Sequence, residues 1–281
     1  MNTIATYNQA CLRCSEIITR QYSTSFSWAI HLLHKDLRAP IHAIYGFVRL
    51  ADEIVDTFHE HNKQALLEQF CADTDQALAT GISMNPILQS FGDTVHKYRI
   101  SQHLIDAFLQ SMRMDLDKSS YADHQELDEY IYGSAEVVGL MCLHVFCEGN
   151  ETQFLQLQPA ARKLGAAFQK INFLRDLNDD SIELKRNYFP EIVCNTFNQE
   201  VKQQIEANIM ADFEGAYEGI LHLPPKARLG VYVAYRYYYS LLKKIKRKLP
   251  SCIMQERVRI PDHSKLAILL VAGIRSRFNL L

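Results

Sequence analysis

The chain has 281 residues, of which 48% are hydrophobic and 22% charged, and its formal net charge is −2. This length suffices for one sizeable core, and the near-neutral charge argues against a nucleic-acid-binding protein, which would carry a basic bias. The seven cysteines are an odd number at scattered positions, which is typical of reduced thiols in the cytoplasm and not of a disulfide framework.

Apolar residues recur every three or four positions along most of the chain, which predicts helices, and no alternating strand pattern interrupts them. No linker of biased composition divides the chain. We therefore predict an all-α protein with one domain over residues 1–281. The predicted helices cover 4–21, 36–57, 62–79, 85–98, 102–117, 125–148, 151–182, 199–221, 225–248 and 262–279, with a loop near 184–194.

The first acidic cluster lies in the predicted helix 36–57. Asp52 and Asp56 are four residues apart, which places both carboxylates on one helix face. Arg49 lies three residues before Asp52 and adds a fixed positive charge beside them. An acidic pair of this kind is common on solvated helix faces, but this one follows directly after the apolar stretch 44–48.

The second acidic cluster lies in the predicted helix 151–182. Asn172, Asp176 and Asp180 repeat the same four-residue step, and Arg175 adjoins Asp176. Oxygen ligands without His or Cys suit a hard ion such as Mg²⁺, which is commonly held by carboxylates together with substrate phosphates. Arginines supply the fixed charge that binds phosphate. The two clusters together predict a metal–diphosphate site between two helices that face each other across a central cavity.

Small residues occur within the apolar helix faces near these clusters. Gly139, Gly165, Ala166 and Ala167 would leave room for a long apolar ligand, although such positions more often simply pack in a core. A diphosphate site above an apolar tunnel would accept a prenyl diphosphate.

At this point the chain resembles the squalene/phytoene synthases, the head-to-head prenyl diphosphate condensing enzymes, and among them the bacterial phytoene synthases most. The resemblance implies an all-α isoprenoid-synthase bundle around a central cavity. It extends from about Tyr22 to the C-terminus and rests on several segments in the family's order. These segments are 22–27, 45–56, 130–139, 169–180 with 187–190, and 236–238 with 256–258.

The family's functional positions carry over residue by residue. The implied metal ligands are Asp52, Asp56, Asn172, Asp176 and Asp180, of which the four aspartates are also implied to be catalytic. The implied substrate contacts are Tyr22, Ser25, Phe26, Tyr45, Arg49, Gln169, Arg175, Tyr238 and Arg257. Tyr132 is a candidate for stabilising a carbocation with its ring. Three positions depart from the pattern of many members, namely Glu136 in place of Gly, Tyr22 in place of His, and Glu53 in place of Asp.

The resemblance implies a transferase of carotenoid biosynthesis that uses Mg²⁺, with Mn²⁺ as an alternative. Two geranylgeranyl diphosphates would condense through a cyclopropyl (prephytoene) diphosphate to phytoene, without NADPH. One alternative is a dehydrosqualene or squalene synthase that uses farnesyl diphosphate. Another is a non-catalytic assembly factor of the same fold, although every ligand position retains an oxygen-bearing side chain.

The ends of the chain bear on its location. The first residues lack a basic and apolar leader, and the apolar run 266–274 is too short to span a bilayer, so we expect a cytoplasmic protein. The basic run 243–248 is either a solvated helix end or a peripheral contact with anionic lipid at the inner face of the membrane. The sequence does not decide between these two interpretations of the basic run. It also does not indicate the oligomeric state.

Overall fold

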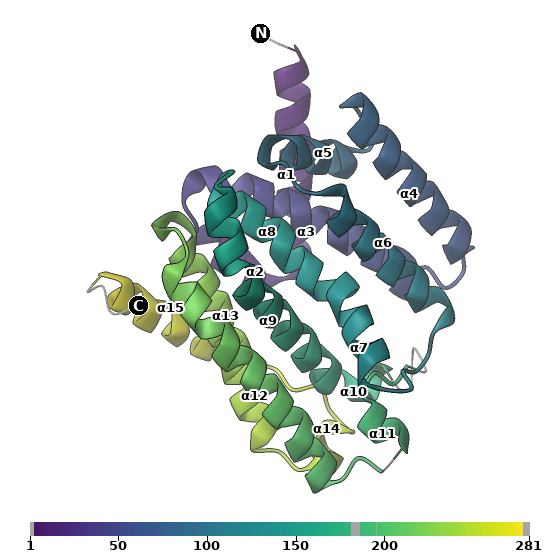
Figure 1. Ribbon diagram of the computed structural model, residues 1–281, viewed down its shortest axis with the longest axis vertical. Coiled ribbons are helices and arrows are strands. Elements are labelled where there is room, and N and C mark those ends of the chain that lie inside the picture. The colour runs from purple at the N-terminus through teal and green to yellow at the C-terminus, as the bar shows by residue number, and fades with distance from the viewer. Residues whose placement is uncertain (1–2, 181–185, 195, 278–281) are drawn as a thin grey trace.

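The computed structural model describes residues 3–180, 186–194 and 196–277, and within these ranges the chain is a bundle of helices (Figure 1). The only β contact among the described residues is an isolated bridge between Ser120 and Asn187. The elements are α1 (Thr3–Tyr22), α2 (Thr24–His31), α3 (Lys35–Asp56), α4 (Lys63–Thr80), α5 (Pro86–Tyr98), α6 (Gln102–Asp117), α7 (His124–Ile131), the π-helical turn η1 (Tyr132–Glu136), α8 (Val137–Cys147), α9 (Glu151–Arg175), α10 (Leu177–Asp179), α11 (Pro190–Cys194), α12 (Gln199–His222), α13 (Pro225–Lys246), α14 (Pro250–Ile253) and α15 (Asp262–Arg277).

The all-α prediction is confirmed, and each of the ten predicted helices has a counterpart. The predicted helix 125–148 is interrupted by η1, and the predicted helix 151–182 breaks at Asp176, where the chain leaves helical geometry for one residue. The short helices α2, α11 and α14 were not predicted, because none is long enough to display a helical period. Parts of three predicted segments, at 181–182, 184–185 and 278–279, lie outside the described residues.

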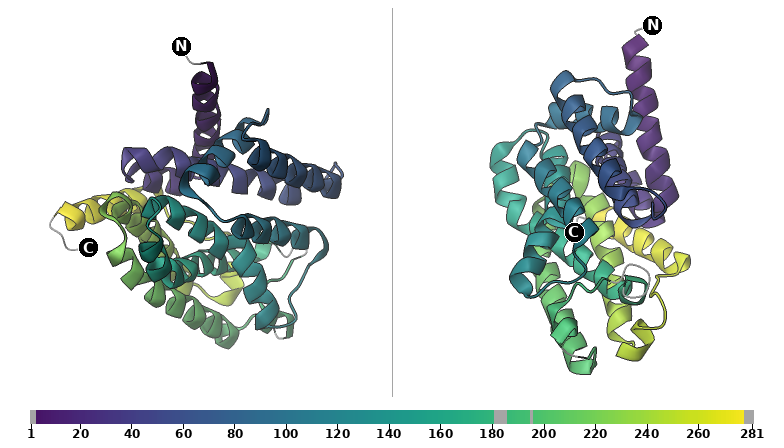
Figure 2. Two further views of the ribbon diagram at one scale, coloured as in Figure 1. Left: turned by 45° about the horizontal axis from the view of Figure 1, so that its top comes forward. Right: turned by 90° about the vertical axis from the view of Figure 1, so that its right-hand side faces the viewer.

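The helices that position the two acidic clusters lie at the centre of the bundle. α9 packs against α8, α12 and α13, while α3 packs against α8 and α2, and α2 packs against α13. This arrangement closes a ring of helices around a central space. α1, α4, α5 and α6 form an outer layer against α3, as the two further views show (Figure 2). Where α3 meets this layer, Phe47 of α3 stacks on Phe91 of α5 with 3.9 Å between ring centres.

One segment, His124–Cys147, is long and apolar enough by composition to cross a bilayer. It comprises α7, η1 and α8, which pack against α6 and α9 at the centre of the bundle, and half of its most apolar window is buried there. The segment is therefore a core element of the bundle, and its apolar character reflects burial within the protein.

A buried ion cluster joins α9 to α12. The Asp212 carboxylate accepts hydrogen bonds from Lys163 Nζ at 2.8 Å and from Lys170 Nζ at 2.7 Å, and Lys170 also donates to Asn208 Oδ1. Asp212 is 2% exposed and Lys170 is 8% exposed, whereas the side chain of Lys163 is 57% exposed. Both lysines belong to the helix that carries the second acidic cluster, so the cluster fixes the position of that helix.

We expect Asp212→Ala to lower the free energy of unfolding by about 3–5 kcal/mol, because it leaves the buried Lys170 ammonium without a counter-charge. Lys163→Ala removes the solvent-exposed partner of the same carboxylate and should cost only about 0–1 kcal/mol. Urea unfolding followed by circular dichroism measures both. Equal losses for the two variants would show that burial of the ion pair does not determine its contribution.

Candidate active site

A cavity of about 600 Å³ lies inside the ring of helices, within the roughly 300–1,000 Å³ typical of ligand sites. Its two ends differ in chemistry. At one end its wall includes acidic and basic side chains from α3, α9, the residues that flank α10 and the segment after α14. At the other end the wall is apolar and comprises Leu33, Phe146, Leu157 and Leu223.

The five predicted ligand positions all line the polar end of this cavity. Asp52 and Asp56 come from the last turns of α3, while Asn172 lies on α9, and Asp176 and Asp180 flank the short helix α10. The helices bring the two clusters close enough for the charge of Asp56 to raise the pKa of Asp180. The predicted opposition of two acidic helices across a cavity is thus present in the fold.

Two of these carboxyls carry strongly shifted pKa values. Burial raises the pKa of Asp52 to about 7, and the nearby negative charge of Asp56 raises it further than Arg49 lowers it. Burial likewise raises the pKa of Asp180 to about 7, with repulsion from Asp176 and Asp56 adding to the effect. Carboxyls that ionise with such difficulty indicate an excess of negative charge, which a bound cation would relieve.

The donor set fits a divalent cation of the Mg²⁺ or Mn²⁺ type. It consists of oxygen ligands, and Asn172 Oδ1 is buried with no hydrogen-bond partner. Among the described residues no three Asp, Glu, His or Cys side chains converge closely enough to hold an ion by themselves. The carboxylates of Asp56 and Asp176 are instead engaged by arginines.

Three arginines engage the acidic residues at the polar end. Arg257 donates from Nε and Nη2 to the two Asp176 oxygens at 2.7 and 3.1 Å, and Arg175 Nε donates to Asp176 Oδ1 at 2.8 Å. Arg49 pairs with Glu53 one turn further along α3. Guanidinium groups bind phosphate oxygens in the same bidentate manner, so this end can hold a diphosphate.

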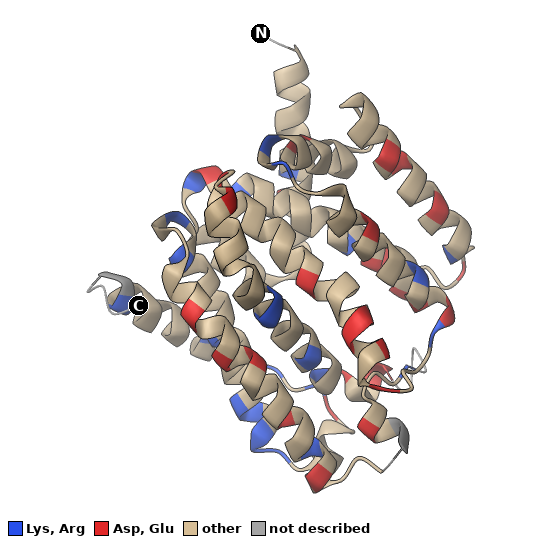
Figure 3. Ribbon diagram, viewed as in Figure 1, with Lys and Arg blue, Asp and Glu red and all other residues tan. Residues whose placement is uncertain are grey.

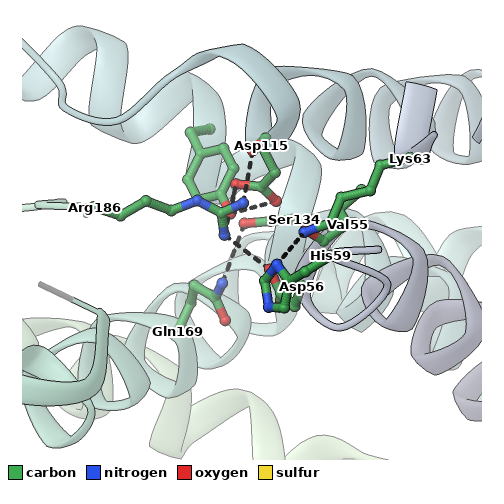
Figure 4. Close-up of polar contacts among 9 residues, drawn as sticks. Val55, Asp56, His59, Lys63, Asp115, Ser134, Gln169 and Arg186 are labelled. Atoms are coloured by element: carbon green, nitrogen blue, oxygen red, sulfur yellow. Dashed lines mark hydrogen bonds and ion pairs between the residues drawn. The ribbon is translucent and has the colours of Figure 1, made fainter. Parts of the chain in front are cut away.

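Sequence reasoning missed a fourth arginine and its partners, which Figure 4 shows in close-up. Arg186 Nη1 lies 2.9 Å from Asp56 Oδ1, and Nη2 donates to the Asp115 backbone carbonyl at 2.6 Å. The Asp115 carboxylate accepts from the Tyr130 hydroxyl at 2.8 and 2.9 Å. Burial raises the pKa of Asp115 to about 7, against the lowering effect of Arg186.

This cluster connects three distant parts of the chain to the cavity wall. Asp115 lies near the end of α6 and had no predicted role, while Arg186 immediately precedes the family-like segment that begins at Asn187. A signal for Arg186 existed in that adjacency, since an arginine beside a Tyr–Phe–Pro segment follows the second acidic cluster directly. Nothing in the spacing of the sequence indicated that Asp115 would reach the same place.

Aromatic rings line the cavity next to the polar end. The ring centre of Phe26 lies 6.0 Å from those of both Tyr45 and Tyr238. The ring of Tyr238 stacks on that of Phe168, with 3.9 Å between their centres. Burial raises the pKa of Tyr45 to about 12, so its hydroxyl stays neutral. Gln169 also lines the cavity, and Tyr22 lies at its rim, half exposed, with the Arg49 guanidinium 4.4 Å from its ring centre.

The structure does not bring Ser25 and Tyr132 into the cavity wall. On α2 the positions that face the cavity are spaced by three or four residues from Phe26, and Ser25 lies off that face. Ser23 is at the wall instead and accepts a hydrogen bond from Phe26 N as the helix cap. Tyr132 turns outward at the start of η1, where its hydroxyl lies 3.3 Å from His103 Nε2 and Arg162 covers its ring. Tyr130, two residues earlier, faces the cavity in its place.

The small residues near the cavity have two roles. Gly139 and Gly165 line the wall, as expected for an apolar ligand site, whereas Ala166 and Ala167 are buried elsewhere in the core. A Cβ atom on Gly165 would lie 2.8 Å from the Ala135 carbonyl oxygen, so this glycine is also required for the close approach of α9 to η1. Gly165 therefore both leaves space in the cavity and allows the close packing of α9 against η1.

The raised pKa values predict how cation binding depends on pH. Asp52 and Asp180 each hold a proton below about pH 7, and a cation must displace these protons to bind. We expect the Kd for Mg²⁺ or Mn²⁺ to rise by about tenfold or more from pH 8 to pH 6 and to change little above pH 8. Titration calorimetry in two buffers of different ionisation enthalpy counts the released protons. An affinity that is constant over this interval would contradict the prediction.

Comparison with known proteins bears directly on this site. A family model described as squalene/phytoene synthase matches residues 19–263, which include every acidic and arginine position discussed above. The chain belongs to the squalene/phytoene synthase family. The family resemblance predicted from the motifs is therefore confirmed.

Relatives of this family align over most of the chain at low identity. Phytoene synthase 1 of Zea mays is 28% identical over 251 residues, 83% of this chain, and the chain spans about 60% of the length of that plant relative. Phytoene synthase of Arthrospira platensis is 26% identical, covering 99% of this chain and 96% of the relative. The 4,4'-diapophytoene synthase of Staphylococcus haemolyticus is also 26% identical, covering 75% of this chain and 72% of the relative.

The fold also matches a solved structure of the same family type. The crystal structure of a dehydrosqualene synthase in complex with ligand superposes with a TM-score of 0.83, covering 96% of this chain and 98% of that one at 19% identity. At this identity the match establishes the fold alone. It confirms the predicted all-α architecture as that of the squalene and dehydrosqualene synthases.

Proposed function

We propose that this chain condenses two molecules of geranylgeranyl diphosphate head to head to form phytoene, with Mg²⁺ or Mn²⁺ at the polar end of the cavity. The observation that carries the proposal is the opposition of two acidic helices, with four arginines among them, at one end of a single cavity whose other end is apolar. A diphosphate requires the first end and a prenyl chain the second.

The proposed reaction breaks two carbon–oxygen bonds and joins the two substrates. In the first half the C1–O bond of one substrate ionises, and the resulting allylic cation is attacked by the C2–C3 double bond of the other. Loss of one proton gives a cyclopropyl diphosphate. In the second half that compound ionises and rearranges to a C1–C1 linkage, and loss of a second proton gives the hydrocarbon. Two diphosphates leave, and no reductant is consumed.

The proposed roles of the residues follow from their positions. The bound cation would neutralise charge on the leaving diphosphate. Asp52, Asp56, Asn172, Asp176 and Asp180 would hold it. Arg49, Arg175, Arg186 and Arg257 would exchange their carboxylate partners for phosphate oxygens. The rings of Phe26, Tyr45 and Tyr238 would face the cations and exclude water from them.

The extent of the cavity along α9 leaves room for a prenyl chain. Gln169 and Leu157 both line it from α9, twelve residues apart, which corresponds to about 18 Å along the helix axis. A chain that reaches from the polar end to Leu157 uses this full depth. Condensation of farnesyl diphosphate is the alternative, and relatives named for phytoene and for diapophytoene match this chain at equal identity.

The test is to incubate the purified protein with geranylgeranyl or farnesyl diphosphate, each with Mg²⁺, Mn²⁺ or a chelator and with or without NADPH, and to analyse the hydrocarbons. We expect phytoene from the C20 substrate, with no effect of NADPH and no product in the chelator. A C30 product alone would assign the chain to the dehydrosqualene or squalene reaction, according to its NADPH dependence. A folded protein that binds the cation yet yields no hydrocarbon would favour a non-catalytic assembly factor.

A further inference from the structure

The last described helix, α15, presents an apolar face to solvent. Leu266, Leu270 and Ile274, one helical turn apart, are 52%, 61% and 58% exposed, and Val271 beside them is 49% exposed. Ala267 is also exposed, so no polar side chain interrupts this face between residues 266 and 274. We call Leu266, Leu270, Val271 and Ile274 the α15 apolar face.

The opposite face of α15 accounts for its attachment to the bundle. Ala272 is buried, and Ile268 and Leu269 pack against the core. Tyr237 Oη on α13 lies 3.4 Å from the Lys265 carbonyl, and Arg275 donates to the Tyr232 hydroxyl at 3.1 Å. The helix is therefore docked on α13 through one side, at the edge of the bundle (Figure 2).

Another long outer helix of the bundle shows what a solvated face looks like in this protein. On α12 the exposed positions are polar, as at Gln203, Gln204, Asn208, Glu214 and Glu218, or small, as at Ala207, Ala211 and Gly215, and none of them is a large hydrophobic residue. Contiguous exposed apolar surface with no polar interruption marks an interaction site more often than a solvated one. Six of the thirteen large exposed hydrophobic residues in the described part of the chain lie between Leu249 and Ile274.

The same part of the chain is strongly basic. Residues 243–281 contain ten Lys or Arg and two Asp or Glu, a net charge of +8, whereas the whole chain has a net charge of −2. Lys243, Lys246 and Arg247 are exposed at the end of α13. Figure 3 shows Lys and Arg positions gathered at this end of the helix. Lys244 Nζ donates to the Arg259 carbonyl, so this basic end lies beside the segment that leads into α15. Basic groups therefore stand near the end of the α15 apolar face at which Leu266 lies.

We propose that the α15 apolar face and the basic end of α13 form a docking surface for a bilayer that contains anionic lipid. Apolar side chains along one side of a helix insert at the level of the headgroups, and neighbouring Lys and Arg are attracted to anionic headgroups. A second copy of this chain is a poorer occupant, because it would bring a second region of charge +8 to the same contact. This surface goes beyond the proposed reaction and does not depend on it.

The surface lies one helix away from the cavity. α15 packs on the outer side of α13, whose inner side lines the cavity through Val231, Ala234 and Tyr238. Lys265 Nζ of α15 also donates to Thr24 Oγ1, next to the wall residue Ser23. Docking at α15 would thus place the cavity close to the lipid surface, where apolar substrates and products partition.

The test is flotation of the full chain, without substrate, with vesicles of phosphatidylcholine alone or of phosphatidylcholine mixed with phosphatidylglycerol. We expect binding to the mixed vesicles that weakens as salt is added. Leu270→Glu should weaken it by about tenfold, because a charge replaces an inserted apolar side chain. Lys246→Glu together with Arg247→Glu should weaken it by about tenfold or more. Circular dichroism and thermal unfolding establish that each variant is folded.

Two matched controls distinguish binding through this surface from non-specific binding to vesicles. Leu155→Glu changes a leucine of similar exposure, 57%, on α9, and Lys35→Glu together with Lys97→Glu reverses two exposed charges elsewhere. Neither control should alter binding. Absence of binding to both kinds of vesicle, or equal loss in the Leu155 and Leu270 variants, would overturn the proposal. A dimer in solution that Leu270→Glu dissociates would overturn it in favour of a second copy.

Discussion

Asp52→Asn and Asp180→Asn should each lower the turnover of prenyl diphosphate by about 10³-fold, because each removes a charged ligand from the site where the leaving diphosphate is neutralised. The two residues come from opposite helices, so both walls of the site are tested. Asparagine keeps the shape and one oxygen of the side chain. The measurement is steady-state formation of hydrocarbon at saturating Mg²⁺.

The matched control is Asp179→Asn. Asp179 adjoins Asp180 in the sequence but does not line the cavity, so its variant should keep turnover within about threefold of the unmodified chain. A loss in Asp179→Asn as large as that in Asp180→Asn would mean that the net charge of the segment, and not the position of one carboxylate, supports the reaction.

The same two substitutions, which lower turnover, should raise the free energy of unfolding of the cation-free protein. In the unfolded chain these carboxyls ionise near pH 4, whereas in the folded protein they ionise at about pH 7, so ionisation destabilises the fold increasingly as pH rises from 4 to 7. Asparagine cannot ionise. In cation-free buffer at pH 8 each variant should therefore be more stable by about 4 kcal/mol, and the difference should disappear near pH 4. Loss of both turnover and stability would instead point to a misfolded site.

Leu157→Trp should change which substrate the protein accepts. Leu157 is 4% exposed to solvent and lines the apolar end of the cavity, about 18 Å from Gln169 along α9. An indole there shortens the cavity, so we expect kcat/KM for the C20 substrate to fall by about 100-fold while that for the C15 substrate stays within about threefold. The measurement is a competition between the two diphosphates with analysis of the products.

Leu155→Trp serves as the control for this substitution. Leu155 is two residues away on the solvent side of α9, and its replacement should leave both substrates unaffected. Retained C15 turnover in Leu157→Trp demonstrates that the overpacked variant is folded. Equal losses for both substrates would show that the far end of the cavity does not select chain length.

The all-α class and the helix ranges were predictable because they depend on local periodicity. Asp52 with Asp56, and Asn172 with Asp176 and Asp180, share helix faces whatever the rest of the chain does, so their common orientation followed from their spacing. The arginines Arg49 and Arg175 were predictable for the same reason. The break of the second helix at Asp176 was not, because a single non-helical residue leaves the apolar period almost unchanged.

The site also brings together residues whose meeting no local pattern indicates. Asp115, Tyr130 and Arg186 meet beside Asp56 from three segments, and only the packing of α6, α7 and the chain before α11 places them together. Tyr132 was expected at the cavity, yet it lies two residues from both Tyr130 and Ser134, which line the wall, so its side chain leaves the other side of the helix, toward His103. The sequence therefore determined the family and the acidic positions that line the cavity, since these rest on residue identity and short spacing. The tertiary structure alone decided the depth of the cavity, the arginine and tyrosine partners of the acids, and the exposed apolar face of α15, since each depends on which helices pack side by side.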